Sequence, residues 1–149
     1  MSEMLKDPAV LREIIMDHYQ YPRNRKKCSD DSYSKVHMAS ESCIDDIEVH
    51  AKINNNLIED IMFDGIACTI STASTSMMTE LLMGKSIDDA RNIIKNYFSM
   101  INETPYDAEI LQEAIAMKGV SKQASRIKCA TIGWNAIAQI LDESENKNE

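Results

Sequence analysis

The sequence predicts an α+β fold in which a three-stranded antiparallel sheet packs against about five helices. Three short segments, 33–39, 47–53 and 57–63, have the character of strands, and the middle one alternates apolar and polar residues. Most of the remaining chain carries apolar residues at helical spacing. With 149 residues, 44% of them hydrophobic and 27% charged, the chain is long and apolar enough for one domain with a real core.

The first predicted helix starts with a capping sequence. Asp7 is a favoured N-cap residue, and Pro8 is favoured at the first helical position. The helix should end before Pro22, because the residue that precedes a proline disfavours the helical conformation. Its apolar face comprises Val10, Leu11, Ile14, Ile15 and His18.

The three strands are predicted to form a meander. Residues 54–56 are all asparagine and form a turn, since asparagine tolerates left-handed dihedrals. In a meander, the connection between the first two strands lies at the same end of the sheet as the exit of the third strand. Cys43 and Asp45 lie in that connection, and Cys68 leaves the third strand. The three side chains are therefore expected to converge.

The rest of the chain is expected to be organised around the stretch Gly65–Met78. A strand pattern runs into it and a helical pattern runs out of it, with Cys68 at the junction. Unpaired N–H groups at a helix start favour a thiolate, the form of cysteine that binds metals and attacks sulfur. A buried structural cysteine at a tight turn is the alternative.

Four helices are predicted after the sheet, each with a start or stop signal. Serine and aspartate supply the starts, and glycine supplies the stops. Residues 143–149 are expected to form a frayed polar tail, which leaves a core of about residues 5–142 in a single domain over 1–149. The predicted helices run from Cys68 to Gly84, from Ser86 to Ile101, over about 105–118 with Gly119 as the stop, and from Ser121 or Ser125 to about Asp142.

Three cysteines and one aspartate are candidate ligands of a single metal site: Cys43, Asp45, Cys68 and Cys129. Three thiolates with a carboxylate suit zinc or an iron–sulfur cluster better than magnesium or calcium. Such a set carries four negative charges, of which Zn²⁺ offsets two. Arg126 lies three residues before Cys129 and can offset another, with a surface salt bridge as its alternative role.

The other candidate groups receive structural roles. His18, His37 and His50 are expected to be satisfied structural histidines, and Cys28 is expected to be an incidental exposed thiol. The sequence contains no Ser-His-Asp arrangement, no glycine-rich phosphate loop and no HExxH motif. These absences argue against a conventional turnover enzyme of those classes.

Net charge and hydropathy argue against a nucleic-acid-binding, membrane-spanning or secreted protein. The net charge of −8 argues against a nucleic-acid partner. No apolar run approaches the ~20 residues that span a membrane, and the start of the sequence lacks the hydrophobic stretch of a signal peptide. A cytoplasmic location with no membrane partner is expected. Four cysteines in a reducing compartment indicate metal or thiol chemistry before disulfides.

These motifs together resemble the IscU/NifU-N family of iron–sulfur cluster assembly proteins, over about residues 5–142. Two features are similar to its SufU-like branch: the segment 105–118 is long enough for an inserted helix, and Lys128 stands where scaffold-type IscU proteins have histidine. The motifs are Met16-Asp17-His18-Tyr19, Pro22-Arg23-Asn24, Cys43-Ile44-Asp45, Cys68 to Ser74 running to Met77-Met78, and Arg126 to Thr131 with Trp134.

The resemblance implies a fold and a function. It implies a three-stranded antiparallel sheet with packed helices, and a metal site at Cys43, Asp45, Cys68 and Cys129. For the SufU-like branch it implies bound zinc and a PLP-dependent cysteine desulfurase, SufS, as partner. Proteins of this branch accept persulfide sulfur and relay it to the downstream cluster assembly machinery. If this activity counts as enzymatic, it is that of a zinc-dependent sulfurtransferase and not of a conventional turnover enzyme. Cys43 matches the sulfur acceptor, and Arg126 matches a basic residue near the site.

The sequence departs from the family pattern at two positions. Ile44 stands where the family has a glycine between the first cysteine and the aspartate. Ala67 stands where the family has another glycine, just before the second cysteine. Glycine permits a positive φ that a β-branched residue resists. Either the loop avoids that conformation here, or metal binding is weaker.

Three hypotheses follow. The leading hypothesis is a zinc-dependent acceptor of persulfide sulfur, and the second is an IscU-type scaffold that builds an iron–sulfur cluster on its own cysteines. The third is a non-catalytic binding module whose zinc only holds the fold together.

Overall fold

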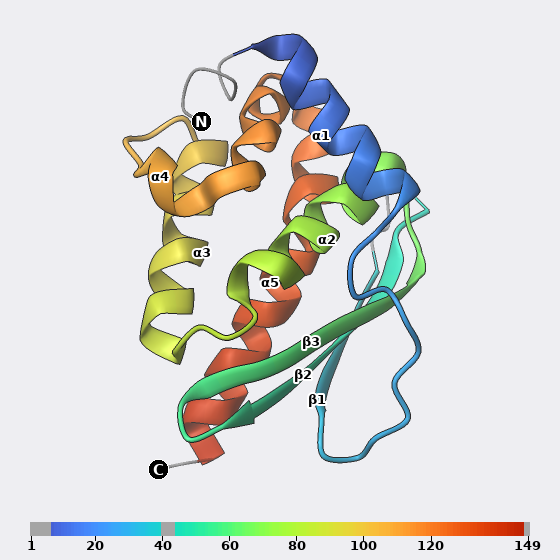
Figure 1. Cartoon of the computed structure of the whole chain (residues 1–149), viewed down its shortest axis with the longest axis vertical. Coiled ribbons are helices and arrows are strands. Elements are labelled where there is room, and N and C mark those ends of the chain that lie inside the picture. The colour runs from blue at the N-terminus through green and yellow to red at the C-terminus, as the bar shows by residue number, and fades with distance from the viewer. Residues whose placement is uncertain (1–6, 40–43, 148–149) are drawn as a thin grey trace.

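The computed structural model describes residues 7–39 and 44–147, and it confirms the predicted α+β class (Figure 1). A three-stranded antiparallel sheet follows the first helix, and the later part of the chain is helical. The elements are α1 (Pro8–Gln20), β1 (Ser34–Ala39), β2 (Asp46–Asn54), β3 (Leu57–Ile66), α2 (Thr69–Leu82), α3 (Ile87–Ile101), α4 (Ala108–Leu111), the 3₁₀ helix η2 (Gln112–Lys122) and α5 (Ala124–Lys147).

The sheet is the predicted meander, in the order β1-β2-β3. Asn55 and Asn56 both have positive φ, 53° and 61°, in the turn between β2 and β3. Asp46, at the start of β2, is paired with Ile66, at the end of β3. The segment before β2 and the segment after β3 therefore meet at one end of the sheet, as predicted.

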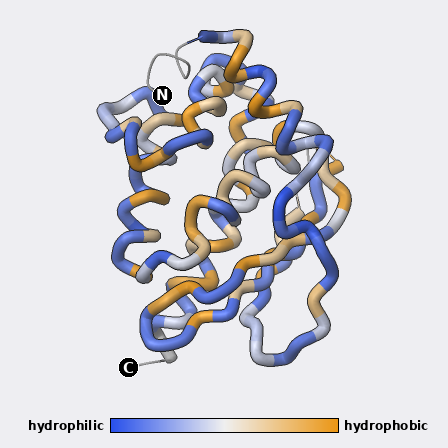
Figure 2. The backbone as a smooth tube through the Cα atoms, viewed as in Figure 1, coloured by the Kyte–Doolittle hydropathy of each residue, from blue (hydrophilic) through white to orange (hydrophobic). Residues whose placement is uncertain are grey.

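One face of the sheet carries the core. The helices lie on that face, and the long α5 contacts β1, β2 and α2 (Figure 1). Hydrophobic residues gather where helices and sheet meet, whereas the loop that follows α1 is mainly hydrophilic (Figure 2). The largest fully buried side chains are Trp134, Tyr97, Phe63, Ile47, Ile58, Ile61, Met78, Leu82, Leu111, Met117, Ile137 and Ile140.

A polar network inside this core joins α2, α3 and α5. The ring of Trp134 stacks on that of Tyr97, with centroids 3.8 Å apart and planes 5° from parallel. Trp134 Nε1 donates a hydrogen bond to Ser74 Oγ at 3.1 Å. Both Ser74 Oγ and Tyr97 Oη donate to the carbonyl oxygen of Ala130, at 2.6 and 2.7 Å. Because these groups are paired, the core tolerates their polarity.

Helices α2 and α5 approach each other closely at Gly133. A Cβ atom on this glycine would lie 2.4 Å from Thr75 Oγ1, nearer than real Cβ atoms come to any neighbour. A larger side chain at position 133 would therefore push apart the two helices that carry Cys68 and Cys129.

The predicted helix starts are confirmed at two caps. Asp7 is the N-cap of α1 and accepts a hydrogen bond from the Ala9 N–H at 2.9 Å, with Pro8 as the first helical residue. Ser86 is the N-cap of α3 and accepts from the Asp89 N–H at 3.1 Å.

The predicted helix over 105–118 is wrong in type and in bounds. Only the short α4 is α-helical, and Gln112 then takes φ +47° and ends it. The chain continues as the 3₁₀ helix η2, which passes through Gly119 instead of stopping there. Buried residues such as Leu111 and Met117 hold this segment on the core, so tertiary packing decides its conformation.

The last helix starts between the two predicted serines and extends further than expected. Helix α5 begins at Ala124 and continues beyond Asp142 to Lys147. Within residues 7–39 and 44–147, no helix combines the length and the apolar character that crossing a lipid bilayer requires.

Candidate metal centre

Cys68 lies at the junction of β3 and α2, where the sequence predicted a helix start. It is the N-cap residue of α2, with the extended dihedrals φ −71° and ψ 174°. Its Sγ atom accepts a hydrogen bond from the Ser71 N–H at 3.5 Å. The thiol therefore occupies the position in which a serine or aspartate side chain commonly caps a helix.

Asp45 lies directly before β2 and reaches the same helix end. Its side chain is buried, at 1% exposure, and its Oδ1 accepts a hydrogen bond from the Cys68 N–H at 2.8 Å. The hydroxyl of Ser71 donates to Oδ2. These two donors and the positive end of the α2 dipole stabilise a buried carboxylate that would otherwise be costly.

Cys129 comes from a third segment of the chain, the second turn of α5. Its side chain is 1% exposed. Burial, followed by hydrogen bonding with Asp45 and Cys68, raises the pKa of the Cys129 thiol to about 12, and a hydrogen bond with Ser71 opposes this rise in part. A thiol in this environment ionises when a cation compensates the charge, since metals bind the thiolate.

The three donors fit a soft or borderline metal ion. One carboxylate oxygen of Asp45 and the sulfur atoms of Cys68 and Cys129 all lie within 4.8 Å of one another. Two sulfur ligands of a tetrahedral zinc ion lie about 3.8 Å apart, at about 2.3 Å from the metal. A donor set with two thiolates suits zinc or iron with sulfide and is a poor match for magnesium or calcium.

The structure does not bring the remaining predicted site residues, Cys43 and Arg126, into this cluster of described side chains. Cys43, the fourth predicted ligand, lies outside the described residues, whereas its neighbour Ile44 is 66% exposed. Ala67 does not adopt a positive φ, so this chain does not need the family's glycine there. Arg126 is exposed on the first turn of α5, and its side chain makes no ion pair with any residue of 7–39 or 44–147.

Each histidine has a polar partner, in agreement with the structural role predicted for all three. His18 Nδ1 lies 2.8 Å from Ser76 Oγ. His37 Nε2 lies 2.5 Å from a carboxylate oxygen of Asp46, and His50 Nε2 lies 2.8 Å from one of Glu48. Cys28 is half-buried rather than exposed, and it borders a surface hollow together with His37 and His50.

Sequence reasoning missed one residue that contacts this cluster. Ser71 bridges Asp45 and Cys68, because its hydroxyl donates to the carboxylate and lies 3.4 Å from Cys68 Sγ. Its position three residues after the N-cap was the available signal, since the N–H of that residue is the usual partner of a capping side chain.

Comparison with known proteins agrees with these features. The family model described as "NifU-like N terminal domain" matches residues 11–149. The zinc-dependent sulfurtransferase SufU of Bacillus subtilis is 39% identical over 92% of this chain and 92% of its own length. The iron–sulfur cluster assembly scaffold protein IscU of Streptococcus pyogenes is 37% identical over 89% of this chain and 83% of its own.

A solved structure supports the fold independently of sequence. The crystal structure of the N-terminal part of a NifU-like protein from Brucella abortus superposes with a TM-score of 0.82, over 91% of this chain and 94% of that one. At 17% identity this likeness concerns the fold alone. From the match over residues 11–149, the chain belongs to the NifU-like N-terminal domain family.

Proposed function

We propose that this protein serves iron–sulfur cluster assembly as a SufU-type, zinc-dependent acceptor of persulfide sulfur. One observation carries the proposal: the carboxylate of Asp45 and the thiols of Cys68 and Cys129 come together at the buried N-terminus of α2. The names of two relatives, a zinc-dependent sulfurtransferase and a cluster assembly scaffold, support the same class of function.

Four residues would hold the metal: Cys43, Asp45, Cys68 and Cys129. Chain connectivity supports the inclusion of Cys43, because two residues of extended chain span at most about 7 Å from Asp45. Zinc bound there would keep the cysteines as thiolates at neutral pH. Ser71 would orient the Asp45 carboxylate, as hydrogen-bonded neighbours of metal ligands commonly do.

Cys43 is the proposed sulfur acceptor. Cys68 caps α2 and Cys129 lies within α5, so neither thiol can leave the site unless a helix moves. Cys43 instead belongs to the connection that leads to Asp45, next to the exposed Ile44. A cysteine in such a connection can turn towards a docked partner at lower cost than one fixed in a helix.

The proposed reaction is a thiol exchange that needs no oxidant. The partner is a PLP-dependent cysteine desulfurase of the SufS type that carries a persulfide on its own cysteine. The Cys43 thiolate attacks the outer sulfur of that persulfide, and a new S–S bond forms. The bond to the desulfurase cysteine breaks, and that cysteine leaves as a thiolate. Cys43 then carries the persulfide and relays it to the downstream cluster assembly machinery.

Arg126 would support this reaction electrostatically. Its guanidinium is exposed one turn before Cys129 and forms no ion pair with a described residue, so it can face an incoming anionic sulfur. Arginine remains charged under all ordinary conditions.

A second candidate function is that of a scaffold on which an iron–sulfur cluster is assembled. The similarity to the Streptococcus pyogenes scaffold protein favours it, because that relative matches a comparable share of the chain, 89% against 92%, at nearly the same identity as the sulfurtransferase does. Metal analysis separates the two functions: a sulfur acceptor is colourless and contains zinc, whereas a scaffold that carries its cluster is brown and contains iron and sulfide.

The test of the leading proposal combines mass spectrometry with activity. Zinc-loaded protein is incubated with a cysteine desulfurase and cysteine, and we expect a gain of one sulfur atom on Cys43, located by digestion. Cys43→Ser should abolish this gain and the stimulation of the desulfurase, whereas the control Cys28→Ser should retain both. A sulfur gain on Cys28 alone, or a Cys43→Ser protein that still stimulates the desulfurase, would overturn the assignment.

A further inference from the structure

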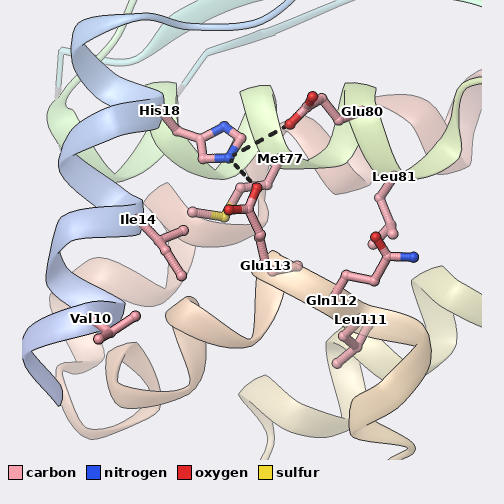
Figure 3. Close-up of a pocket in the computed structure, with 10 residues that line it drawn as sticks. Val10, Ile14, His18, Met77, Glu80, Leu81, Leu111, Gln112 and Glu113 are labelled. Carbon is pink, nitrogen blue, oxygen red and sulfur yellow. Dashed lines mark hydrogen bonds and ion pairs between the residues drawn. The ribbon is translucent and has the colours of Figure 1, made fainter. Parts of the chain in front are cut away.

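A second cluster of metal-binding side chains lies further along α2, apart from the thiol site. His18 comes from α1, Glu80 from α2 and Glu113 from η2, and the three side chains point towards one another (Figure 3). Thiol donors are absent from this cluster. Its potential ligand atoms are one ring nitrogen and two carboxylate oxygens, all within 4.8 Å of one another.

The ring of His18 is buried and fixed. It is 0% exposed, and its Nδ1 lies 2.8 Å from Ser76 Oγ. That serine oxygen also accepts a hydrogen bond from the Arg23 N–H at 2.8 Å, which holds it in place. With a proton on Nε2, the ring donates a hydrogen bond to Glu113 Oε1, whereas with the proton on Nδ1 the ring donates to Ser76 and Nε2 offers its lone pair to a cation bound between the two glutamates. Metal-binding histidines usually have this arrangement, with the second ring nitrogen donating to a neighbour.

The two carboxylates lie on the solvent side of the ring. Glu113 Oε1 is 3.2 Å and Glu80 Oε1 is 3.8 Å from His18 Nε2, and the two glutamate side chains are 50% and 46% exposed. Glu80 has one further polar neighbour among the described residues, Arg23 Nε at 3.7 Å, which is too far for a hydrogen bond. The Glu80 carboxylate therefore faces a histidine and an arginine without a hydrogen bond to either.

The charges of this region are unbalanced. Among the described residues, Arg23 is the one Lys or Arg that forms an ion pair with a member of the cluster, and it already forms a 2.6 Å ion pair with Asp17. With neutral His18, the carboxylates of Asp17, Glu80 and Glu113 leave two negative charges uncompensated. A divalent cation between the two glutamates would neutralise them.

The spacing suits coordination as well as it suits an ion pair. Two nitrogen or oxygen ligands at about 2.1 Å from a metal ion lie about 3.4 Å apart in a tetrahedron and about 3.0 Å apart in an octahedron. The observed separations of 3.2 and 3.8 Å from Nε2 bracket the tetrahedral value. Only the exposed glutamate side chains would have to adjust.

The cluster also has space for water ligands. It borders a cavity of about 450 Å³, whose other walls include Ile14, Met77, Leu81 and Leu111 (Figure 3). Apolar walls on one side and a convergent polar group on the other are typical of small-ligand sites.

We propose that His18 Nε2 and the carboxylates of Glu80 and Glu113 form a second divalent-cation site. Its nitrogen and oxygen donors select a first-row ion of harder character than the thiol site does, and Mn²⁺ is the diagnostic example. Because the three ligands come from α1, α2 and η2, a bound ion would fasten the 3₁₀ segment to the two helices.

The test uses protein whose thiol site is already filled. The chain is loaded with one equivalent of Zn²⁺ and titrated with Mn²⁺, and free Mn²⁺ is followed by electron paramagnetic resonance. We expect about one Mn²⁺ per chain. The double variant Glu80→Gln/Glu113→Gln should weaken Mn²⁺ binding about tenfold or more, since it removes both charged ligands. It should stay folded, because both side chains are half exposed.

A matched control removes the same charge elsewhere. Glu13→Gln/Glu109→Gln changes two exposed glutamates outside the cluster and should bind Mn²⁺ as wild type does. Equal Mn²⁺ affinity in wild type and in Glu80→Gln/Glu113→Gln would overturn the proposal, as would equal weakening in the control. Either result leaves the assignment of the thiol site untouched, because that site is tested through sulfur transfer.

Discussion

Helix α2 contains two polar sites of opposite construction. At its N-terminus, Cys68 and the buried Asp45 are fixed by the N–H groups and the hydroxyl of the first helical turn. Further along, Ser76 fixes the ring of His18, but Glu80 reaches that ring from the exposed side. Both sites join three segments of the chain, but the first gathers buried donors around the capped end of α2, whereas the second adds two half-exposed carboxylates to one buried ring.

The comparison shows how a site's construction governs its sensitivity to change. Donors attached to a helix cap are coupled to folding, because the same groups satisfy the backbone and would bind the metal. Half-exposed carboxylates are coupled to folding only weakly. Changes at the N-terminus of α2 should therefore affect both stability and metal binding, whereas changes around His18 should separate the two.

Metal removal should give the largest effect. A ligand present at about 100 times its Kd stabilises the folded state by about 2.7 kcal/mol, so chelation should lower Tm by about 5–10 °C. The helical circular dichroism should survive, since a chain of 149 residues has a core without the metal. Differential scanning calorimetry with and without a chelator measures this, and loss of the helical signal would contradict it.

Asp45→Ala should give the second-largest effect, on both stability and zinc retention. It leaves the Cys68 N–H and the Ser71 hydroxyl without their acceptor, which costs about 1–3 kcal/mol of unfolding free energy. Zinc loss to a colorimetric chelator should also accelerate. The control Asp46→Ala changes the adjacent exposed residue and removes its ion pair with His37, which should cost at most about 1 kcal/mol and leave zinc loss unchanged. Unchanged exchange kinetics in Asp45→Ala would remove Asp45 from the ligand set.

Ser71→Ala and Ser76→Ala form a matched pair that sharpens the comparison. Both serines are fully buried on α2. Ser71→Ala should weaken zinc binding about tenfold, because Asp45 loses the donor that orients it. Ser76→Ala should leave zinc binding unchanged and cost about 1 kcal/mol of stability. If Ser76→Ala weakened zinc binding as much as Ser71→Ala, the two sites would not be separate, and unweakened binding in Ser71→Ala would exclude Ser71 as the group that orients Asp45.

Tyr97→Phe tests the polar network between the two sites through its pH dependence. Burial raises the pKa of Tyr97, and the hydrogen bond with Ser74 opposes this in part. The folded state then prefers the protonated phenol, so stability is intact below the ordinary tyrosine pKa of about 10 and falls as pH rises beyond it. In Tyr97→Phe this alkaline loss of stability should be smaller, as urea unfolding at a series of pH values would show. An identical alkaline slope would exclude Tyr97 as its cause.

Ile44→Gly should give the smallest effect. Glycine costs about 0.5–1 kcal/mol in conformational entropy, and the exposed Ile44 side chain contributes little packing. Zinc affinity should be unchanged or improved, because the substitution restores the residue that the family has there. A clear fall in affinity by competition titration would mean that Ile44 packs usefully against its neighbours.

Much of the fold and of the thiol site followed from local signals in the sequence. The caps at Asp7 and Ser86, and the asparagine turn at Asn55, depend on residues within one turn of chain. The meeting of Asp45 with Cys68 followed from the meander, whose geometry places their segments at one end of the sheet.

The parts that were missed depend on long-range packing. Nothing local distinguishes the 3₁₀ helix η2 from an α-helix, since its conformation follows from burial against distant elements. Glu113 is 95 residues from His18 along the chain, so no spacing rule brings them together. The histidine was expected to be satisfied, but the identity of its partners needed the tertiary structure.

The stack of Trp134 on Tyr97 has an optical consequence. Trp134 is the one tryptophan of the chain, and its indole ring lies against a tyrosine while its Nε1 donates to Ser74 of α2. Since the indole belongs to α5 and its partners belong to α2 and α3, its emission should change if the packing of these helices changes. Intrinsic fluorescence can therefore test, in real time and without a label, whether the core beside the two thiols rearranges as a ligand arrives or leaves.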